Sequence, residues 1–314
     1  MRRFRGNSGR HDGECSIGLL TLSRPVGYAP MSERTDRAVA LIEEFSQGAM
    51  SGPDARLSEL GIDSLAFAEL ALALEAEMGA DLSDGAVDGS SRVSDVLAAA
   101  EAGAREEGDL PRAIGALQSF SGLVGGWALR WWFAMRVEGA ANVPRSGSAI
   151  LAMNHESSLD IPLSVVACPR EIVFMAKREL FKNAFVRWWI RMLGGFRVDR
   201  DSFDLRAIRM ALSVLARKQV LGMYPEGTRS PGELLPFLNG AAWLALRTGA
   251  SIVPCAISGT DRSSEARRPR RMRVRVSFAP PIAVGKVDDP LESLAKAPAI
   301  TAEIREAIEA RLVR

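Results

Sequence analysis

The stretch SAILAMNHESSLD, residues 148–160, joins a short apolar run to a polar segment that contains His155 and Asp160. An apolar run of this length between polar segments predicts a buried β-strand. Side chains with a function often gather where the strands of an α/β sheet end. The only other histidine, His11, lies in a polar N-terminal stretch. The sequence therefore predicts a central strand followed directly by a candidate site.

The same alternation of apolar runs and helical stretches continues on both sides of this strand. Strands are predicted over 148–154, 171–176, 220–225, 251–259 and 273–281. Helices are predicted between them, for example over 202–218 and 239–249. Strands that alternate with helices favour an α/β domain, here expected to contain a mixed sheet.

The residues before this α/β region follow a helical pattern instead. Residues 33–46 place their apolar residues on one helical face. A second helix is expected within 57–79, with Asp63 or Ser64 able to cap its N-terminus. A short last helix is expected over 92–102. These features predict a small all-α helical bundle ahead of the α/β domain.

Charge separates the two predicted domains. The net charge is +2, but residues 31–110 hold 18 acidic and 5 basic residues, whereas residues 111–314 hold 18 acidic and 30 basic residues. Domains of opposite charge attract one another or matching partners. The acidic domain would repel nucleic acid, so we expect no nucleic-acid partner. The seven arginines of residues 262–275 could dock the acidic domain or anionic lipid, or form a solvated hairpin.

The expected boundaries follow from these changes of pattern. Residues 1–30 show no helical or strand period and are expected to be a disordered tail or a mis-called start. The acidic domain is expected over 31–104, a polar linker over 105–112 and the α/β domain over 113–314. A short linker raises the local concentration of one domain near the other. Docking within one chain and docking between chains both remain open.

Cysteine spacing and hydropathy indicate the compartment. The three cysteines, Cys15, Cys168 and Cys255, lie far apart. They form no metal-spaced pair and no disulfide framework, so we expect a reducing cytosol and no metal. Residues 120–135 and 185–196 set tryptophans beside arginines, which suits either a helix in the lipid headgroup layer or a core helix. We expect a cytoplasmic protein that is peripheral on the inner face of the cell membrane.

Two sites of chemistry stand out from the spacing. His155 and Asp160 would lie roughly 140° apart on a continuous helix, so they can meet only if His155 lies in a loop and Asp160 begins a helix. Asp160 would then fix the imidazole tautomer; the alternative is a histidine that caps a helix. The second site is YPEGTRS, residues 224–230. Its turn could expose amides, and Arg229 could bind a phosphate or simply be solvated.

The motif LGIDSL, residues 60–65, resembles the acyl carrier protein family, and the resemblance covers roughly 33–104. The resemblance implies that this small all-α domain is a four-helix bundle. A bare helix cap at Asp63 and Ser64 is the alternative. The resemblance implies that Ser64 carries 4′-phosphopantetheine, attached by a phosphopantetheinyl transferase, with an acyl chain held as a thioester. A serine at a helix start suits this role, because its hydroxyl is exposed and the positive helix end neighbours the phosphate.

The α/β region resembles the glycerolipid acyltransferases, a family that includes the 1-acylglycerol-3-phosphate acyltransferases. Four ordered blocks over roughly 115–285 carry the resemblance: Asn154, His155 and Asp160; Gly194, Phe196 and Arg200, after an AK-x-EL stretch at Ala176, Lys177, Glu179 and Leu180; Tyr224 to Ser230; and Ile252 to Pro254. Tyr224 replaces a phenylalanine of the family. Residues 236–240, PFLNG, lack a lysine found in many relatives, which puts a phosphate-bearing acceptor in doubt.

The resemblance implies acyl transfer from a thioester of acyl carrier protein or coenzyme A to the hydroxyl of a lysophospholipid such as 1-acyl-glycerol 3-phosphate, in phospholipid biosynthesis. His155 would be the general base and Asp160 its orienting carboxylate. The implied substrate-binding residues are Lys177, Arg200, Glu226, Gly227, Thr228 and Arg229. Alternatives are a carrier module that serves other enzymes, glycerol 3-phosphate as acceptor, a thioester hydrolase, and an acyl-serine route through Ser157 or Ser158.

Overall fold

The computed structural model describes residues 33–46, 52–79, 82, 87, 89–102, 130–177, 195–198, 205–230, 232–260 and 273–312. The expected tail (1–30), the expected linker (105–112) and most of the arginine-rich stretch lie outside the described residues. The tryptophan-containing stretch at 185–196 is described only at its last two residues. The boundaries placed there therefore stay predictions.

The N-terminal domain is helical, as predicted. It contains α1 (Glu33–Phe45), the 3-10 helix η1 (Leu57–Leu60), α2 (Ser64–Met78) and α3 (Val93–Ala102). The helix expected within 57–79 begins at Ser64 as expected, and the separate turn η1 before it ends where Gly61 takes a left-handed conformation, φ 78°. Asp63 then caps α2: its side chain accepts the amide N–H groups of the two residues after Ser64. Apolar side chains from all four helices form a core around Phe67 and Leu74.

The C-terminal domain has a seven-stranded mixed sheet in the order β1-β7-β6-β2-β5-β3-β4. The strands are β1 (Arg136–Glu138), β2 (Ala149–Met153), β3 (Ile172–Lys177), β4 (Gly195–Val198), β5 (Val220–Met223), β6 (Ser251–Ser258) and β7 (Arg275–Phe278). Neighbouring strands run parallel, except that β6 and β7 are antiparallel. The predicted α/β fold and mixed sheet are confirmed, and each strand expected from an apolar run is present.

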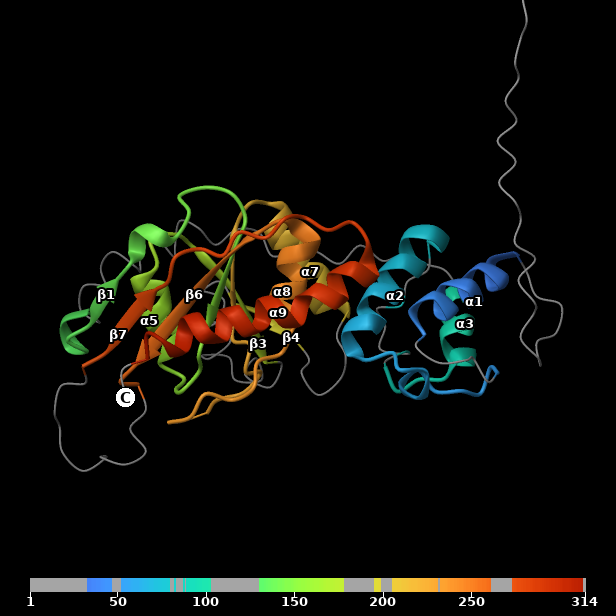
Figure 1. The fold of residues 1–314 in the computed structure, drawn as a ribbon, viewed down its shortest axis with the longest axis horizontal. Coiled ribbons are helices and arrows are strands. Elements are labelled where there is room, and N and C mark those ends of the chain that lie inside the picture. Colours follow the sequence, from blue (N-terminus) through green and yellow to red (C-terminus); the bar gives the residue numbers. More distant parts are fainter. Residues whose placement is uncertain are drawn as a thin grey trace, which may run out of the picture.

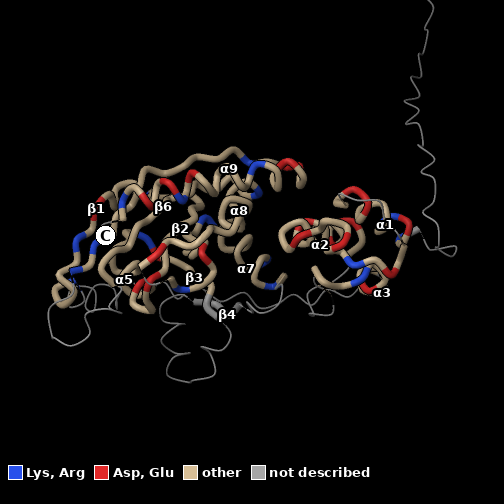
Figure 2. Tube along the Cα trace, turned by 60° about the horizontal axis from the view of Figure 1, so that its bottom comes forward, with Lys and Arg blue, Asp and Glu red and all other residues tan. Residues whose placement is uncertain are grey.

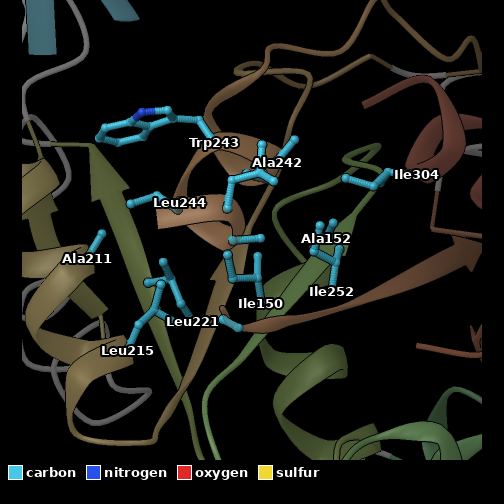
Figure 3. Close-up of a cluster of buried hydrophobic side chains, with 14 of the residues drawn as sticks. Ile150, Ala152, Ala211, Leu215, Leu221, Ala242, Trp243, Leu244, Ile252 and Ile304 are labelled. Atoms are coloured by element: carbon cyan, nitrogen blue, oxygen red, sulfur yellow. The ribbon is translucent and has the colours of Figure 1, made fainter. Parts of the chain in front are cut away.

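Helices cover both faces of this sheet (Figure 1). The alternation of β2 points Ile150 and Ala152 toward one face and Leu151 and Met153 toward the other. The first face packs against α7 (Leu205–Ala216), α8 (Gly240–Thr248) and α9 (Pro290–Glu309), around the cluster drawn in Figure 3. The second face packs against α5 (Asp160–Ala167). Such a strand, buried on both faces, reads as one continuous apolar run.

One long helix, α9, was not expected from the sequence. Its start carries the expected signals, because Pro290 is the first helical residue and Asp289 caps the helix by accepting the amide N–H groups of Leu291 and Glu292. Pro298 lies inside the helix and interrupts the periodic pattern by which a helix is recognised. The short strands β1 and β4 were also not predicted.

The N-terminal domain lies at one end of the molecule, where α2 is next to α7 and α9 (Figure 1). Acidic residues are distributed over its helices (Figure 2). The two domains are in direct contact through hydrogen bonds, for example between Trp243 and Glu69. The contact therefore brings the acidic domain against the basic one.

Other expectations concern membranes, metals and cysteines. In the part of the chain that the structure describes, no helix is both long and apolar enough to cross a membrane. The same residues hold no cluster of three or more side chains suited to a metal ion. Cys168 and Cys255 are buried free thiols. Burial raises the pKa of both thiols, well above the usual value for Cys255, so both are protonated at neutral pH.

Candidate active site

The centre of the site is a contact between His155 and Asp160. The imidazole Nδ1 lies 2.9 Å from the Asp160 carboxylate Oδ2. The same oxygen accepts the backbone N–H groups of Glu156 and Ser157, each over 2.8 Å. Asp160 is fully buried and His155 is nearly so. Hydrogen bonds from two amides stabilise the ionised carboxylate, which in turn favours the tautomer that carries its proton on Nδ1.

Local structure explains why these two residues meet. Strand β2 ends at Met153, and His155 lies in the loop that follows it. Asp160 is the first residue of α5, so the chain turns back between them. Asn154 anchors this turn to the neighbouring strand β6: its side chain donates to the Ile257 carbonyl over 2.9 Å and accepts the Ile257 N–H over 2.7 Å. The loop-and-helix arrangement required by the spacing is therefore the one observed.

An aromatic side chain that the sequence analysis did not assign supports the imidazole. The ring of Tyr224 stacks on His155, with centroids 4.1 Å apart and an interplanar angle of 22°. Phe174 stacks behind Tyr224 at 6.3 Å. Tyr224 follows β5 and Phe174 belongs to β3, strands that pair directly. Adjacent parallel strands thus fix the plane of the histidine, and the change from phenylalanine to tyrosine preserves the aromatic face.

Glu226 joins the two motifs. Its carboxylate Oε1 accepts the His155 backbone N–H over 2.8 Å. Its Oε2 accepts the Ser230 hydroxyl and, over 3.0 Å, the Leu235 N–H. The Ser230 N–H returns to the His155 carbonyl over 2.8 Å. Glu226 is buried, so it positions the loops around the site.

The rest of the YPEGTRS turn is more open. Gly227 has φ +68°, a conformation that favours glycine. Thr228 and Arg229 are exposed. The guanidinium of Arg229 donates to the Ser158 hydroxyl over 2.8 Å. This contact sets a cation beside the loop that carries His155.

For the other two predicted cationic residues, Lys177 and Arg200, no side-chain contact with the site is described. Lys177 is the last residue of β3 and pairs with Val198 of β4, so its backbone lies at the carboxyl edge of the sheet, where β2 and β5 also end. Arg200 lies outside the described residues. The structure thus brings His155, Asp160, Glu226 and Arg229 together.

Ser64 belongs to a separate site in the N-terminal domain. It is exposed and is the first residue of α2. Asp63, the residue before it, supplies the cap by accepting the N–H groups of Leu65 and Ala66 over 2.9 and 2.8 Å. The Ser64 hydroxyl is therefore not required for the cap. An exposed hydroxyl at the N-terminus of a 15-residue helix fits attachment of a group that contains a phosphate.

Comparison with protein-family models identifies both domains. Residues 37–100 match the phosphopantetheine attachment site. Residues 134–258 match the acyltransferase family. The first match contains Ser64 and the second contains His155, Asp160 and Arg229.

Known proteins resemble the acyltransferase part of the chain. A 1-acyl-sn-glycerol-3-phosphate acyltransferase of Bacillus subtilis is 29% identical over 141 residues, which are 45% of this chain and 70% of the relative. A Streptococcus pneumoniae protein of the same name is 31% identical, over 46% of this chain and 56% of the relative. The crystal structure of PlsC from Thermotoga maritima, a 1-acyl-sn-glycerophosphate acyltransferase, is 22% identical with a TM-score of 0.47, over 90% of this chain and 100% of that one.

Two stretches of the chain therefore match known family models, one a phosphopantetheine attachment site and the other an acyltransferase. The predicted resemblance to both families, the enzyme class and the phosphopantetheine cofactor are confirmed. The domain boundaries and the role of each site residue stay predictions.

Proposed function

From an acyltransferase domain and a phosphopantetheine attachment domain in one chain, we propose that this protein moves a fatty acyl chain from a thioester to the hydroxyl of a lysophospholipid such as 1-acyl-glycerol 3-phosphate. The observation that carries the proposal is the buried contact of 2.9 Å between His155 Nδ1 and Asp160. It leaves the second ring nitrogen, Nε2, to take a proton from the acceptor.

His155 is the general base in this proposal. Nε2 removes the proton of the acceptor hydroxyl while the oxygen attacks the thioester carbonyl. The C–O bond forms, the C–S bond breaks, and the proton held by His155 passes to the departing sulfur. Asp160 stabilises the imidazolium that exists between these proton transfers. Tyr224 keeps the ring in the required plane.

Arg229 is the proposed contact for the acceptor phosphate. Its guanidinium is exposed and lies beside the His155 loop, and guanidinium groups bind phosphate oxygens through paired hydrogen bonds. Lys177 and Arg200 are proposed to assist, whereas Gly227 and Thr228 shape the pocket. The names of the relatives, which specify 1-acyl-sn-glycerol 3-phosphate, support this acceptor over glycerol 3-phosphate.

Ser64 is the proposed attachment residue of 4′-phosphopantetheine. When bound, the group supplies a thiol that carries the acyl chain as a thioester. The chain contributes an exposed hydroxyl at the start of α2, which a phosphopantetheinyl transferase can reach. Protein isolated from cells that contain this transferase should show the added mass, and the Ser64→Ala variant should not. An equal mass increment in both would contradict the assignment.

A membrane surface is the proposed location of the reaction, on the cytoplasmic face. Trp131 and Trp132 are 56% and 65% exposed, and Leu238, which lies beside the YPEGTRS turn, is 63% exposed. Exposed tryptophans suit the lipid headgroup layer. Replacing both tryptophans with alanine should reduce cosedimentation with anionic vesicles several-fold. Unchanged binding would remove this location from the proposal.

The decisive experiment offers a panel of acceptors to the purified protein that carries phosphopantetheine. The protein is loaded with a labelled acyl chain, and the lipid products are identified by mass spectrometry. We expect labelled diacyl-glycerol 3-phosphate from the lysophospholipid and little product from glycerol 3-phosphate. Release of free fatty acid without an acceptor would instead indicate a hydrolase.

A further inference from the structure

Helix α2 of the N-terminal domain contacts the acyltransferase domain through a buried glutamate, Glu69, which is 1% exposed. Its Oε1 accepts the indole N–H of Trp243 over 2.7 Å and the hydroxyl of Ser293 over 3.1 Å. The Nε of Arg247 lies 3.0 Å from the same oxygen. These donors belong to α8 and α9 of the other domain. We name Glu69, Trp243, Arg247 and Ser293 the Glu69 cluster.

Apolar packing surrounds this cluster. Ala68 is fully buried within the main core of the acyltransferase domain, and Leu65 and Leu72 pack against that core. In the opposite direction, Leu205 of α7 is buried in the core of the N-terminal domain. Leu294 of α9 packs against both cores. The two hydrophobic cores are therefore continuous across the contact.

An ion pair adds a second polar contact along α2. Arg209 of α7 donates to Glu75 through Nε, over 3.1 Å, and through Nη2. The two side chains are only 27% and 16% exposed. Burial lowers the pKa of Arg209, but an arginine starts so far above neutrality that it stays charged. The contact thus joins the acidic domain to the basic domain at two points, six residues apart on one helix.

Burial of Glu69 makes this arrangement specific. A buried carboxylate is destabilising unless donors surround it. Three donors held by two different helices provide this environment for one orientation of α2. A partner that lacked a matching indole, guanidinium and hydroxyl would leave the carboxylate unpaired. The Glu69 cluster therefore selects this acyltransferase surface over others.

A series of contacts connects the start of α2 with the candidate active site. Leu65, the residue after Ser64, packs against the cluster that includes Trp243. Trp243 is within one turn of the start of α8 at Gly240. Just before α8, the Leu238 N–H donates to the carbonyl of Pro225, the neighbour of Glu226. A continuous series of contacts thus links the start of α2 to the His155 loop.

We infer that the Glu69 cluster docks the carrier domain on its own acyltransferase domain, so that the acyl thioester on Ser64 is the donor for His155 of the same chain. This inference rests on the proposed function and specifies its donor. The acyl carbon exchanges its bond to the carrier sulfur for a bond to the acceptor oxygen, and the acceptor proton ends on the sulfur.

The first test is a single-turnover measurement with acyl-loaded protein and excess lysophospholipid. For delivery within one chain, the rate constant should not depend on protein concentration. A mixture of loaded His155→Ala protein with unloaded Ser64→Ala protein can react only between chains. At about 1 µM it should react at least about 100-fold more slowly, because a tether provides a millimolar effective concentration. Equal rates in both formats would overturn the inference.

The second test compares Glu69→Gln with Glu44→Gln, the same change at an exposed glutamate of α1. Glu69→Gln should slow transfer within the chain about tenfold or more, because the amide oxygen can still accept hydrogen bonds but no longer carries the negative charge that pairs with Arg247. Glu44→Gln should react at the parental rate. Transfer from acyl-coenzyme A to the same acceptor reports whether the acyltransferase domain remains active. Parental transfer within the chain by Glu69→Gln would overturn the inference.

A charge exchange keeps the inference testable if Glu69→Gln is poorly folded. Glu75→Arg and Arg209→Glu should each slow transfer within the chain, and the double variant should recover much of the rate. Absence of recovery, in double-variant protein that still uses acyl-coenzyme A, would contradict docking at this surface. Loss of transfer from every donor in the parent protein would instead overturn the proposed function, and the inference with it.

Discussion

Two buried glutamates perform comparable structural roles in different parts of the molecule. Glu226 lies within the acyltransferase domain, and two of its three donors are backbone N–H groups, those of His155 and Leu235. Glu69 lies between the domains, and its donors are all side chains of the partner domain. The two backbone donors lie in loops of the same domain, and they reach Glu226 only when that domain is folded, so Glu226 is part of the fold. Side-chain donors on a separate domain can be released as a unit, so Glu69 belongs to a docking contact.

Because the two glutamates lie in different places, their variants should differ in how fast they transfer an acyl chain from each of two donors, the carrier domain of this protein and acyl-coenzyme A. A change at the catalytic edge of the sheet should affect every thioester donor equally. A change at the domain contact should affect only the acyl chain carried by this protein. The rate of acyl transfer is therefore measured for each variant with both donors, the acyl chain on Ser64 (the internal donor) and acyl-coenzyme A. A change at the active site should lower both rates, and a change at the domain contact should lower only the first.

His155→Ala should have the largest effect. Loss of a general base lowers turnover by about 10²–10⁴-fold, and the loss should be the same with both donors. The alanine keeps the backbone N–H that Glu226 accepts, so circular dichroism and the melting temperature should change little. A variant that retained near-parental turnover would remove His155 from the mechanism.

Glu226→Gln should have an intermediate effect, and mainly on stability. The amide retains one oxygen but directs an NH₂ group toward a backbone or hydroxyl donor, so a buried hydrogen bond is lost. This costs about 1–3 kcal/mol, which corresponds to a decrease in melting temperature of about 2–4 °C for each kcal/mol. Both donors should be used more slowly because the His155 loop is less fixed. If Glu226→Gln slowed transfer only from the acyl chain carried by this protein, Glu226 would behave like Glu69, and the proposed difference between the two glutamates would be wrong.

Arg209→Gln should have the smallest effect. Its ion pair with Glu75 is partly exposed, and such pairs typically contribute about 0.2–1 kcal/mol. Transfer from the internal donor should slow by only a few-fold, whereas transfer from acyl-coenzyme A should be unchanged. Salt screens partly exposed pairs, so the difference from the parent should shrink as the ionic strength rises. A loss larger than that of Glu69→Gln would reverse the proposed order of the two contacts.

Much of the candidate site was accessible from the sequence because its residues lie at the ends of recognisable strands. The apolar runs of β2 and β5 located His155 and the YPEGTRS turn, and the five-residue spacing required the loop that the structure contains. The stacking of Tyr224 on His155 could not be predicted in the same way. It depends on the lateral order of the strands, which sets β2 beside β5, and an apolar run does not specify its neighbours.

For the contact between the carrier domain and the acyltransferase domain, the sequence predicted only that the two domains carry opposite charges. Opposite charges indicated that the domains attract, and the arginine-rich residues 262–275 were one candidate surface. The described contact involves α7, α8 and α9, of which α9 was not predicted at all, and most of residues 262–275 lie outside the described residues. Glu69 resembles any other glutamate of an acidic helix in the sequence, because its burial depends on donors that lie 174 and 224 residues away.

The sequence by itself determined the two domain types, the helix start that presents Ser64 and the loop that joins His155 to Asp160, since each depends on local periodicity, capping and spacing. Only the tertiary structure decided which carboxylates are buried and which surface of one domain meets the other. Burial is a property of the surroundings rather than of the residue: a carboxylate becomes favourable in the interior only when the folded chain brings donors from distant segments to it.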